Sequence, residues 1–307
     1  MQELSYYNGR RDFLKQSAIL MAGVSAFGLS PLFADSAKKG EVMIQTLNNG
    51  VKMPIIGLGT YSLLGKDCER AILDALKVGY RAFDTAQMYK NEAEIGNAIK
   101  KSGFKREEIF ITTKLSSDMS YEATKKSIEN SLKALKLDYV DLLLLHRAYP
   151  QARQMYKAME EFYKEGKIKA LGISNFDTKV YLDFVKSVKV IPAVNQVQVN
   201  VFFQREELQK AMQKHKTIMQ AWSPFAKGEK DFFNNETLKN IGKKYNKSVA
   251  QVGLRYLIER GINVIPKSSK KERMAENLNI FDFSLSSADM AAIKTLDTNK
   301  SIFGWDV

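Results

Sequence analysis

The chain has 307 residues, of which 45% are hydrophobic and 26% are charged, so it is long enough for one large domain with an ordinary soluble core. Its formal net charge of +13 suits a phosphorylated ligand or an anionic surface, but scattered lysines favour a solvated surface, and no basic stripe with interleaved aromatic residues indicates nucleic-acid binding. The single cysteine, Cys68, excludes an intrachain disulfide, and the two histidines, His146 and His215, have no metal-ligand spacing, so we expect no metal site.

The N-terminal segment 1–36 is predicted to be an export signal rather than part of the fold. Arg10 and Arg11 are followed by Asp-Phe-Leu-Lys and a mildly apolar run, a pattern that resembles a twin-arginine signal. Cleavage is expected after Ala34 or Ser36, because both are small. The apolar run is too short and too interrupted to predict stable membrane insertion. We therefore expect export, for instance to the periplasm, through the twin-arginine machinery; an uncleaved leader on a cytoplasmic protein is the alternative.

The remaining region, 37–307, begins with a predicted β-hairpin. Met43–Leu47 and Val51–Met53 flank an Asn-Asn-Gly turn, and Asn-Gly supplies the positive φ angles of a tight hairpin. After it, short apolar runs alternate with amphipathic helical patterns, which predicts a (β/α)8 TIM barrel with an N-terminal β-hairpin. The predicted barrel strands are Ile55–Leu58, Ala82–Asp84, Ile109–Thr113, Val140–Leu145, Ala170–Ile173, Ala193–Val197, Ile218–Trp222 and Val264–Ile265.

The predicted helices follow these strands in turn, with a terminal helix after the last pair. A doubly wound fold is the structural rival, but Gly57-Leu58-Gly59-Thr60-Tyr61-Ser62 lacks the third glycine of the dinucleotide-binding fingerprint. No linker, repeat or low-complexity segment divides the region, so we expect one domain. The helices are Asp67–Val78, Glu92–Lys101, Tyr121–Leu135, Ala152–Glu165, Thr178–Ser187, Arg205–His215, Ser248–Glu259, Lys270–Asn277 and Ser286–Leu296, with a loop and a short extra helix over Phe232–Tyr245.

Four polar residues lie where three successive predicted strands end. Asp84 and Tyr89 belong to the segment Gly-Tyr-Arg-Ala-Phe-Asp-Thr-Ala-Gln-Met-Tyr, Lys114 closes the next strand, and His146 closes the apolar run that follows. In a barrel of parallel strands the carboxyl ends all face one mouth. We therefore expect these four side chains to meet in one pocket.

Together these residue types indicate proton transfer to a carbonyl group. Tyrosine has an unperturbed pKa of about 10, and a nearby ammonium such as that of Lys114 would make Tyr89 a better proton donor near neutral pH. Asp84 would hold Lys114 in place, and His146 would donate a hydrogen bond to the carbonyl. Because the set contains no activated Ser or Cys, a hydride from a cofactor is its natural complement. Taken singly, each residue has a structural alternative as a cap, loop aromatic, solvated lysine or structural histidine.

The chain resembles the aldo-keto reductases along essentially all of 42–307. The resemblance rests on Gly-Tyr-Arg-Ala-Phe-Asp-Thr-Ala with Tyr89, Thr-Lys114, Leu-Leu-His146, Gly-Ile-Ser-Asn-Phe over 172–176, Asn-Gln196 and Ile-Pro-Lys-Ser over 265–268. It implies carbonyl reduction by NADPH, with Tyr89 as general acid, Lys114 and Asp84 tuning it, and His146 orienting the carbonyl. Histidine at 146, where relatives that reduce a steroid double bond carry glutamate, argues for C=O chemistry.

By this resemblance a second set of residues would hold the nicotinamide. Ser174, Asn175 and Gln196 would hydrogen-bond its carboxamide, because Asn and Gln offer both donor and acceptor groups. Trp222 stands where a tyrosine commonly stacks on the ring and would provide a larger platform. Ser223 continues that motif. Capping of loops is the structural alternative for the polar residues.

A third set would bind the adenosine end of the cofactor. Lys267, Ser268 and Arg273 would contact a 2′-phosphate, with the arginine supplying a planar fork. Glu276 and Asn277 share a helix face with Arg273 and would read the adenine. The set favours NADPH over NADH, and an ordinary surface helix is the alternative.

Departures from the family pattern indicate an open substrate pocket. Arg147 follows His146 where many relatives have a tryptophan, and it would either favour acidic or hydroxylated substrates or point to solvent. The loop 115–119 also lacks the usual aromatic residue. Besides His146 and Arg147, the residues expected to line the pocket are Tyr61, Phe303 and Trp305.

We therefore expect a monomeric, NADPH-dependent oxidoreductase that reduces aldehydes or small ketones. A reductase of keto-sugars such as diketogluconate is the alternative within this class. A cofactor-binding sensor with little turnover is the alternative from another class, although the intact set of four residues argues against it. A barrel hydrolase would need a carboxylate pair or a metal site, and the sequence patterns indicate neither.

Overall fold

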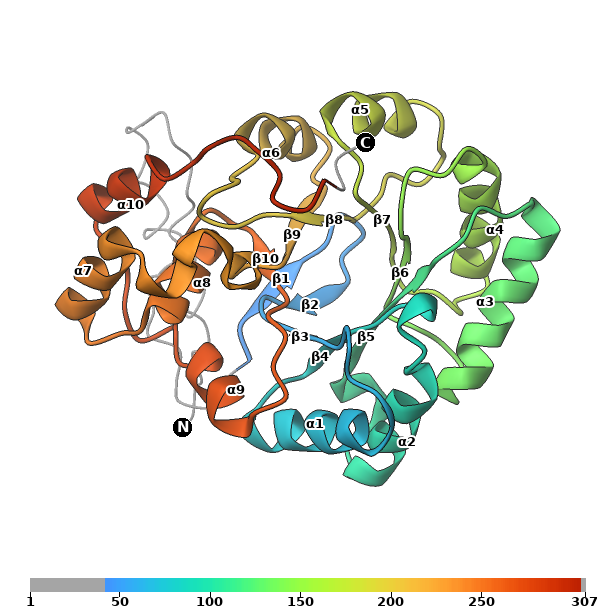
Figure 1. Cartoon of the computed structure of the whole chain (residues 1–307). Coiled ribbons are helices and arrows are strands. Elements are labelled where there is room, and N and C mark those ends of the chain that lie inside the picture. The colour runs from blue at the N-terminus through green and yellow to red at the C-terminus, as the bar shows by residue number, and fades with distance from the viewer. Residues whose placement is uncertain (1–41, 305–307) are drawn as a thin grey trace, which may run out of the picture.

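Eight parallel strands form a ring at the centre of the molecule, with helices around it (Figure 1). The computed structural model describes residues 42–304, so the predicted signal over 1–36 and Trp305 lie outside the described residues. Parallel bridges Ile56–Val264 and Gly59–Lys267 join the first strand region to the last and close the ring. The predicted (β/α)8 barrel is confirmed. Its strands are β3 Leu58–Gly59, β4 Ala82–Asp84, β5 Phe110–Leu115, β6 Leu142–Leu145, β7 Leu171–Ser174, β8 Val194–Gln198, β9 Ile218–Trp222 and β10 Asn263–Val264.

The apolar core has an inner part inside the ring and an outer part between strands and helices. Along β6, Leu142 and Leu144 belong to the inner cluster, whereas Leu143 and Leu145 belong to the outer one. Successive side chains of a strand point to opposite faces. Both faces of this strand are covered, which explains why its sequence is an uninterrupted apolar run instead of an alternating one.

The helices of the outer layer begin at capping residues that the sequence provides. The Ser120 hydroxyl accepts a hydrogen bond from the Ala123 N–H at the start of α3, and Ser248 forms a capping box with Gln251 at the start of α8. The helices are α1 Gly65–Val78, α2 Glu92–Ser102, α3 Tyr121–Leu135, α4 Ala152–Lys164, α5 Thr178–Val185, α6 Glu206–Gln213, α7 Glu236–Tyr245, α8 Val249–Glu259, α9 Lys271–Leu278 and α10 Ser287–Lys294, with short 3₁₀ helices η1 Gln87–Tyr89, η2 Arg106–Glu108 and η3 Ala226–Asn234.

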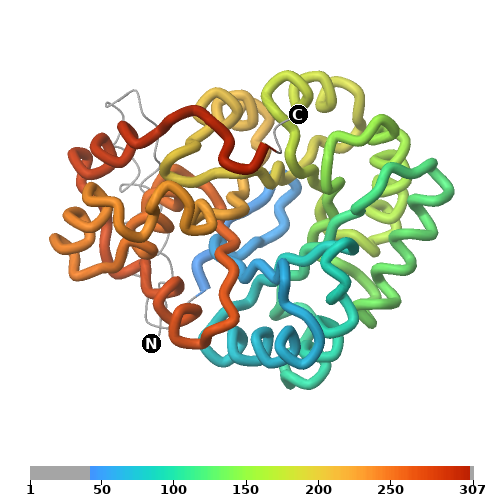
Figure 2. Tube along the Cα trace, in the orientation of Figure 1, coloured from blue at the N-terminus to red at the C-terminus, as the bar shows by residue number. Residues whose placement is uncertain are grey.

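The predicted N-terminal hairpin is confirmed and closes one end of the barrel. Strands β1 Ile44–Thr46 and β2 Lys52–Pro54 pair in antiparallel register. Leu47 and Met53 pack with residues at the amino ends of the barrel strands, such as Phe110. Figure 2 shows the hairpin behind the centre of the ring. The opposite end, where the strands finish, is therefore the open mouth.

The structure differs from the sequence prediction mainly at element ends. Strand β5 runs to Leu115, beyond the predicted end at Thr113, so Lys114 lies within the strand and not after it. The loop after β9 contains η3 before the extra helix α7, which spans Glu236–Tyr245. Several left-handed residues interrupt η3, and these turns were not visible in the sequence pattern.

The segment after α10 runs back toward the mouth (Figure 1). The Thr298 N–H donates to the Phe202 carbonyl at 3.0 Å, and the Ser301 hydroxyl donates to Gln198 Oε1 at 2.8 Å. These bonds bring Phe303 beside Trp222, with ring centroids 5.8 Å apart. Within 42–304, no helix has the length and apolar character needed to cross a bilayer.

Candidate active site

Lys114 and Asp84 form a buried ion pair at the mouth of the barrel. The Lys114 ammonium donates to Asp84 Oδ1 at 2.5 Å and to the Thr85 carbonyl at 2.8 Å. The two charged side chains are 0% and 4% exposed. Thr60 fixes the end of β4 by donating its hydroxyl to the Asp84 carbonyl at 2.9 Å. Removing one member of such a pair typically costs about 3–5 kcal/mol, so each charge requires the other.

Tyr89 lies in η1, beyond the end of β4, and its hydroxyl reaches back to the ion pair. The hydroxyl oxygen is 3.4 Å from Lys114 Nζ, and Nζ is 4.8 Å from the centroid of the ring. Two amides hold this turn in place. Gln87 Nε2 donates to a serine hydroxyl on α3 at 2.8 Å, and Asn91 Nδ2 donates to two carbonyls of the loop after β3. The tyrosine is thus positioned by the loop and not by a strand end.

Burial and the ion pair together set the protonation of these groups. Burial raises the pKa of Tyr89 above its ordinary value. The Lys114 ammonium lowers this pKa, as expected, but by less than burial raises it. Burial alone would lower the pKa of Lys114, but attraction to Asp84 and Tyr89 leaves that pKa raised. Tyr89 therefore holds its proton and Lys114 its charge, the states required of a proton donor and the cation beside it.

His146 directly follows β6 and lies beside Tyr89. Its backbone N–H donates to the Leu115 carbonyl at 3.0 Å, and its ring centroid is 5.8 Å from that of Tyr89. Burial lowers the pKa of His146 to about 3, and the charges of Lys114 and Arg147 act in the same direction. The imidazole is therefore neutral at physiological pH. A neutral imidazole has one N–H donor and one acceptor nitrogen, so it can donate a single hydrogen bond.

The predicted substrate residues lie around this centre. Tyr61 is 54% exposed, and its ring packs edge-on against that of Tyr89, with centroids 5.1 Å apart. Arg147 is exposed at the residue after His146. The C-terminal segment brings Phe303 to the same mouth, where its ring lies beside that of Trp222. The structure thus places Tyr61 and His146 against Tyr89, and Arg147 directly follows His146 in the chain.

Gln196 is tied to the ion pair by an amide whose orientation its neighbours impose. Its Nε2 donates to Asp84 Oδ2 at 2.6 Å and to Gln220 Oε1 at 2.7 Å. A carboxylate only accepts, so the amide nitrogen must face Asp84. From Gln220 the chain of hydrogen bonds continues to Asn263 at 2.7 Å and from there to the Pro54 carbonyl at 2.8 Å. Among the described residues, Gln196 Oε1 accepts no hydrogen bond, so it is an acceptor available to a ligand.

Asn175 links the histidine to the aromatic platform. Its backbone has a left-handed φ of 61°, a conformation that asparagine adopts more readily than most residues. Its Nδ2 donates to the His146 carbonyl at 3.0 Å and to the Ser174 hydroxyl at 3.1 Å. Its Oδ1 accepts from Trp222 Nε1 at 2.9 Å. Ser174, Asn175, Gln196 and Trp222 are therefore brought to one side of the mouth, next to the turn at Ser223.

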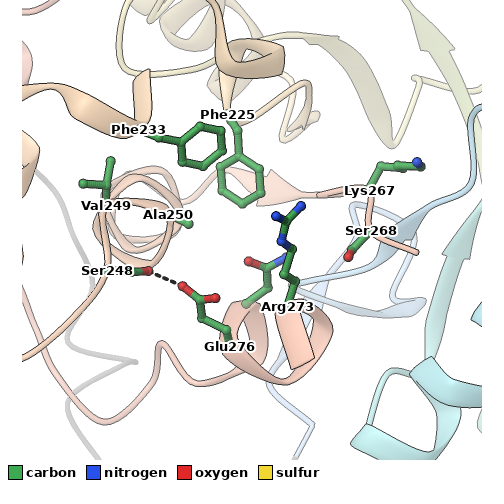
Figure 3. A pocket seen from close by; sticks show the side chains of 10 residues that line it. Phe225, Phe233, Ser248, Val249, Ala250, Lys267, Ser268, Arg273 and Glu276 are labelled. Atoms are coloured by element: carbon green, nitrogen blue, oxygen red, sulfur yellow. Dashed lines mark hydrogen bonds between the residues drawn. The ribbon is translucent and has the colours of Figure 1, made fainter. Parts of the chain in front are cut away.

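The residues predicted for the adenosine end line one cavity of about 510 Å³. Figure 3 shows Arg273 and Glu276 on α9 across from Phe225 and Phe233, with Lys267 to one side. The Glu276 carboxylate accepts from the Ser248 hydroxyl at 2.5 Å. The exposed Lys267 and Arg273 contribute positive charge to its lining. The predicted residues that line this cavity are Lys267, Ser268, Arg273, Glu276 and Asn277.

Comparison with known proteins decides the family. The model described as "Aldo/keto reductase family" matches residues 55–298. The chain belongs to this aldo/keto reductase family. It is 41% identical over 259 residues to the glyoxal reductase of Bacillus subtilis, covering 83% of this chain and 93% of that protein.

Solved aldo-keto reductases have the same fold. One from a Medee basin deep-sea metagenome library is 44% identical, with a TM-score of 0.82, and the match covers 84% of this chain and 97% of that one. An aldo-keto reductase from Bombyx mori, solved in complex with NADP, is 32% identical, with a TM-score of 0.80, and the match covers 85% of this chain and 94% of that one.

In this aldo-keto reductase the sequence patterns did not single out three polar residues near the centre: Ser116, Gln220 and Asn263. Gln220 lies inside the strand β9 and Asn263 stands between the apolar Ile262 and Val264, a signal that each has a buried partner. Ser116 had no such signal, because a hydroxyl in a loop after a strand is ordinary. The described part of the chain contains no cluster of three or more His, Cys, Asp or Glu side chains that could hold a metal.

Proposed function

We propose that this aldo-keto reductase reduces aldehydes or small ketones to alcohols with NADPH, using Tyr89 as general acid. The observation that carries the proposal is the Tyr89 hydroxyl, 3.4 Å from a lysine ammonium that is buried and paired with Asp84. A protonated tyrosine at the mouth can give its proton to a carbonyl oxygen, and the adjacent ammonium stabilises the phenolate that results. His146 would donate a second hydrogen bond to that oxygen.

The cofactor sites fit a phosphorylated dinucleotide. Lys267 and Arg273 supply two cations beside the Ser268 hydroxyl in the cavity between α8 and α9, a donor set that suits the 2′-phosphate of NADPH. At the other end, Gln196 offers an acceptor and Trp222 an aromatic face to the nicotinamide. When bound there, the cofactor supplies a hydride. The NADP complex of the Bombyx mori protein supports this choice.

The test follows NADPH absorbance with the full-length chain and a panel of aldehydes, including glyoxal, beside Tyr89→Phe. We expect turnover by the unchanged protein and a loss of at least 100-fold in kcat in the variant, since general acid catalysis contributes about 10²–10⁴-fold. NADPH binding, followed by fluorescence, should be the same in both proteins. Tight NADPH binding without turnover would reject the reductase and favour the cofactor-binding sensor.

A keto-sugar acid such as diketogluconate is the second candidate substrate, and Arg147 favours it. Arg147 directly follows His146, and its positive charge contributes to lowering the pKa of that histidine. We expect Arg147→Ala to raise KM for a carboxylate-bearing ketone by about tenfold, the worth of roughly 1.4 kcal/mol, and to leave KM for glyoxal unchanged. Equal effects on both substrates would assign Arg147 no role in recognising the carboxylate.

We also propose that segment 1–36 directs the protein through the twin-arginine export machinery and that 37–307 is the catalytic domain. The adjacent Arg10 and Arg11 before an apolar run support this. The route carries folded proteins, so a cofactor could be loaded before export. Fractionation of a bacterium that expresses Arg10→Lys together with Arg11→Lys should show the protein retained in the cytoplasm. An unchanged distribution would reject the signal.

A further inference from the structure

Ser116 makes a contact with His146 that no step of the proposed chemistry has yet used. Its hydroxyl oxygen lies 3.0 Å from His146 Nδ1. The same oxygen accepts a hydrogen bond from the Met88 N–H at 3.2 Å and is 3.3 Å from the Lys114 carbonyl. Ser116 is half-buried just past β5. It therefore touches the strand that carries the lysine, the turn that carries Tyr89, and the histidine itself.

The other ring nitrogen of His146 faces the site. Within 42–304, Nε2 of His146 forms no hydrogen bond. It is also not one of the buried polar atoms without a partner, so this nitrogen is accessible to solvent. It therefore faces open space beside Tyr89, where a carbonyl would bind. To donate a hydrogen bond there, Nε2 must carry the proton of the neutral ring, and Nδ1 must then accept one.

The contacts of the Ser116 hydroxyl favour Nδ1 of His146 as the hydrogen-bond acceptor. A hydroxyl has one proton to donate, and the Met88 N–H already occupies one of its acceptor sites. The remaining proton can go to His146 Nδ1 at 3.0 Å or to the Lys114 carbonyl at 3.3 Å, and the shorter, near-ideal contact is to the histidine. Donation to Nδ1 leaves the ring proton on Nε2.

We propose that Ser116 is a positioning residue that sets the tautomer of His146, keeping its Nε2–H directed at the substrate carbonyl. The role rests on the proposed reductase function, but the tautomer itself is a property of the protein without substrate. Loss of the hydroxyl removes the donor to Nδ1. The ring then populates the Nδ1–H form, in which Nε2 has no proton to give.

Nitrogen NMR of the full-length chain tests this directly, because the chain has only two histidines. Long-range ¹H–¹⁵N correlations distinguish a protonated ring nitrogen from an unprotonated one, and a His215→Gln variant assigns the two rings. We expect His146 in the Nε2–H form at pH 7. Ser116→Ala should shift it toward the Nδ1–H form, and Ser116→Thr, which keeps a hydroxyl, should restore the original spectrum. Ser117→Ala is the matched control, since Ser117 is exposed and adjacent.

Turnover provides the second readout. Ser116→Ala should lower kcat for carbonyl reduction by about tenfold, equivalent to roughly 1.4 kcal/mol, without changing Kd for NADPH. An Nδ1–H ring in the unchanged protein, or an Nε2–H ring unaffected by Ser116→Ala, would overturn the proposal. If the unchanged chain reduces no carbonyl, the proposed function fails, while the spectra still decide what Ser116 does to the histidine.

Discussion

At the scale of single residues, the centre combines a fixed charge pair with two neutral groups. Lys114 and Asp84 neutralise each other within the barrel wall, and Tyr89 and His146 face the mouth uncharged. The low pKa of the histidine has a thermodynamic consequence, because the unfolded chain does not share it. In the unfolded state its pKa returns to about 6.5, whereas burial and nearby cations hold it at about 3 in the folded state.

This difference predicts acid sensitivity. A folded-state pKa below the unfolded one means that the unfolded state binds a proton first as pH falls, so the contribution of His146 is complete above pH 6.5 and is lost toward pH 3. Between pH 7 and 4.5 we expect the unfolding free energy of the unchanged protein to fall by about 2–3 kcal/mol more than that of His146→Gln. Urea titrations at both pH values measure it. Parallel losses in the two proteins would contradict the expectation.

At the scale of elements, close approach of helices depends on small residues at particular places. Gly96 in α2 lies against the end of α3, where an added Cβ would be only 2.1 Å from the Leu135 carbonyl oxygen. That oxygen belongs to the backbone, so it cannot move without shifting the helix. α2 also follows the turn that carries Tyr89. The packing of these two helices therefore supports the turn that carries Tyr89 from outside the ring.

We expect Gly96→Ala to lower the unfolding free energy by about 1–3 kcal/mol, the usual cost of overpacking, despite the higher helix propensity of alanine. Lys100→Ala, an exposed change on the same helix, is the control and should have almost no effect. Thermal unfolding of the three proteins compares them. A Tm for Gly96→Ala equal to that of Lys100→Ala would show that α2 shifts freely.

Elements marked by an apolar run could be predicted from the sequence, whereas those that depend on buried polar residues or left-handed turns could not. Ile218–Trp222 was predicted with the bounds observed, because a strand buried on both faces is a short apolar run between helices. The end of β5 was missed, because Lys114 and its neighbours are polar yet fully buried in the strand. The turns of η3 depend on left-handed residues such as Lys227 and Asp231, which sequence preference does not identify.

The candidate site also has a part that could be predicted from the sequence and a part that could not. Asp84, Lys114 and His146 could be predicted because parallel strands bring their carboxyl ends together, whatever the details of packing. The contact between Ser116 and His146 could not, because it depends on the path of one loop between β5 and α3. The gathering of residues was thus predictable, and the orientation of their rings and amides was not.

At the scale of the whole molecule, one chain of hydrogen bonds runs through the barrel from its closed end to its mouth. It starts at the Pro54 carbonyl on the hairpin and passes through Asn263, Gln220 and Gln196 to Asp84. All three amide side chains in the chain are buried. The hairpin is therefore connected to the Asp84 carboxylate at the mouth by polar contacts as well as by apolar packing.

Breaking this chain of hydrogen bonds next to the hairpin should destabilise the whole domain. Asn263→Ala leaves the Gln220 amide and the Pro54 carbonyl without partners, and each buried unpaired group costs about 1–3 kcal/mol. We expect a loss of about 2–4 kcal/mol in the unfolding free energy, measured by urea titration. Asn279→Ala, at an exposed position, is the matched control. A loss no larger than in the control would mean that water replaces the missing amide.

The two hydrogen bonds of the Asn175 side-chain amide to His146 and Trp222 affect how the specificity of such an enzyme can change during evolution. One amide supports the histidine on one side and the indole of Trp222 on the other. A mutation that adapts the pocket to a new carbonyl by moving the backbone at His146 would therefore also disturb the indole that we propose holds the cofactor. Routes to a new specificity would be narrow here, and the order in which mutations arise would decide which of them survive.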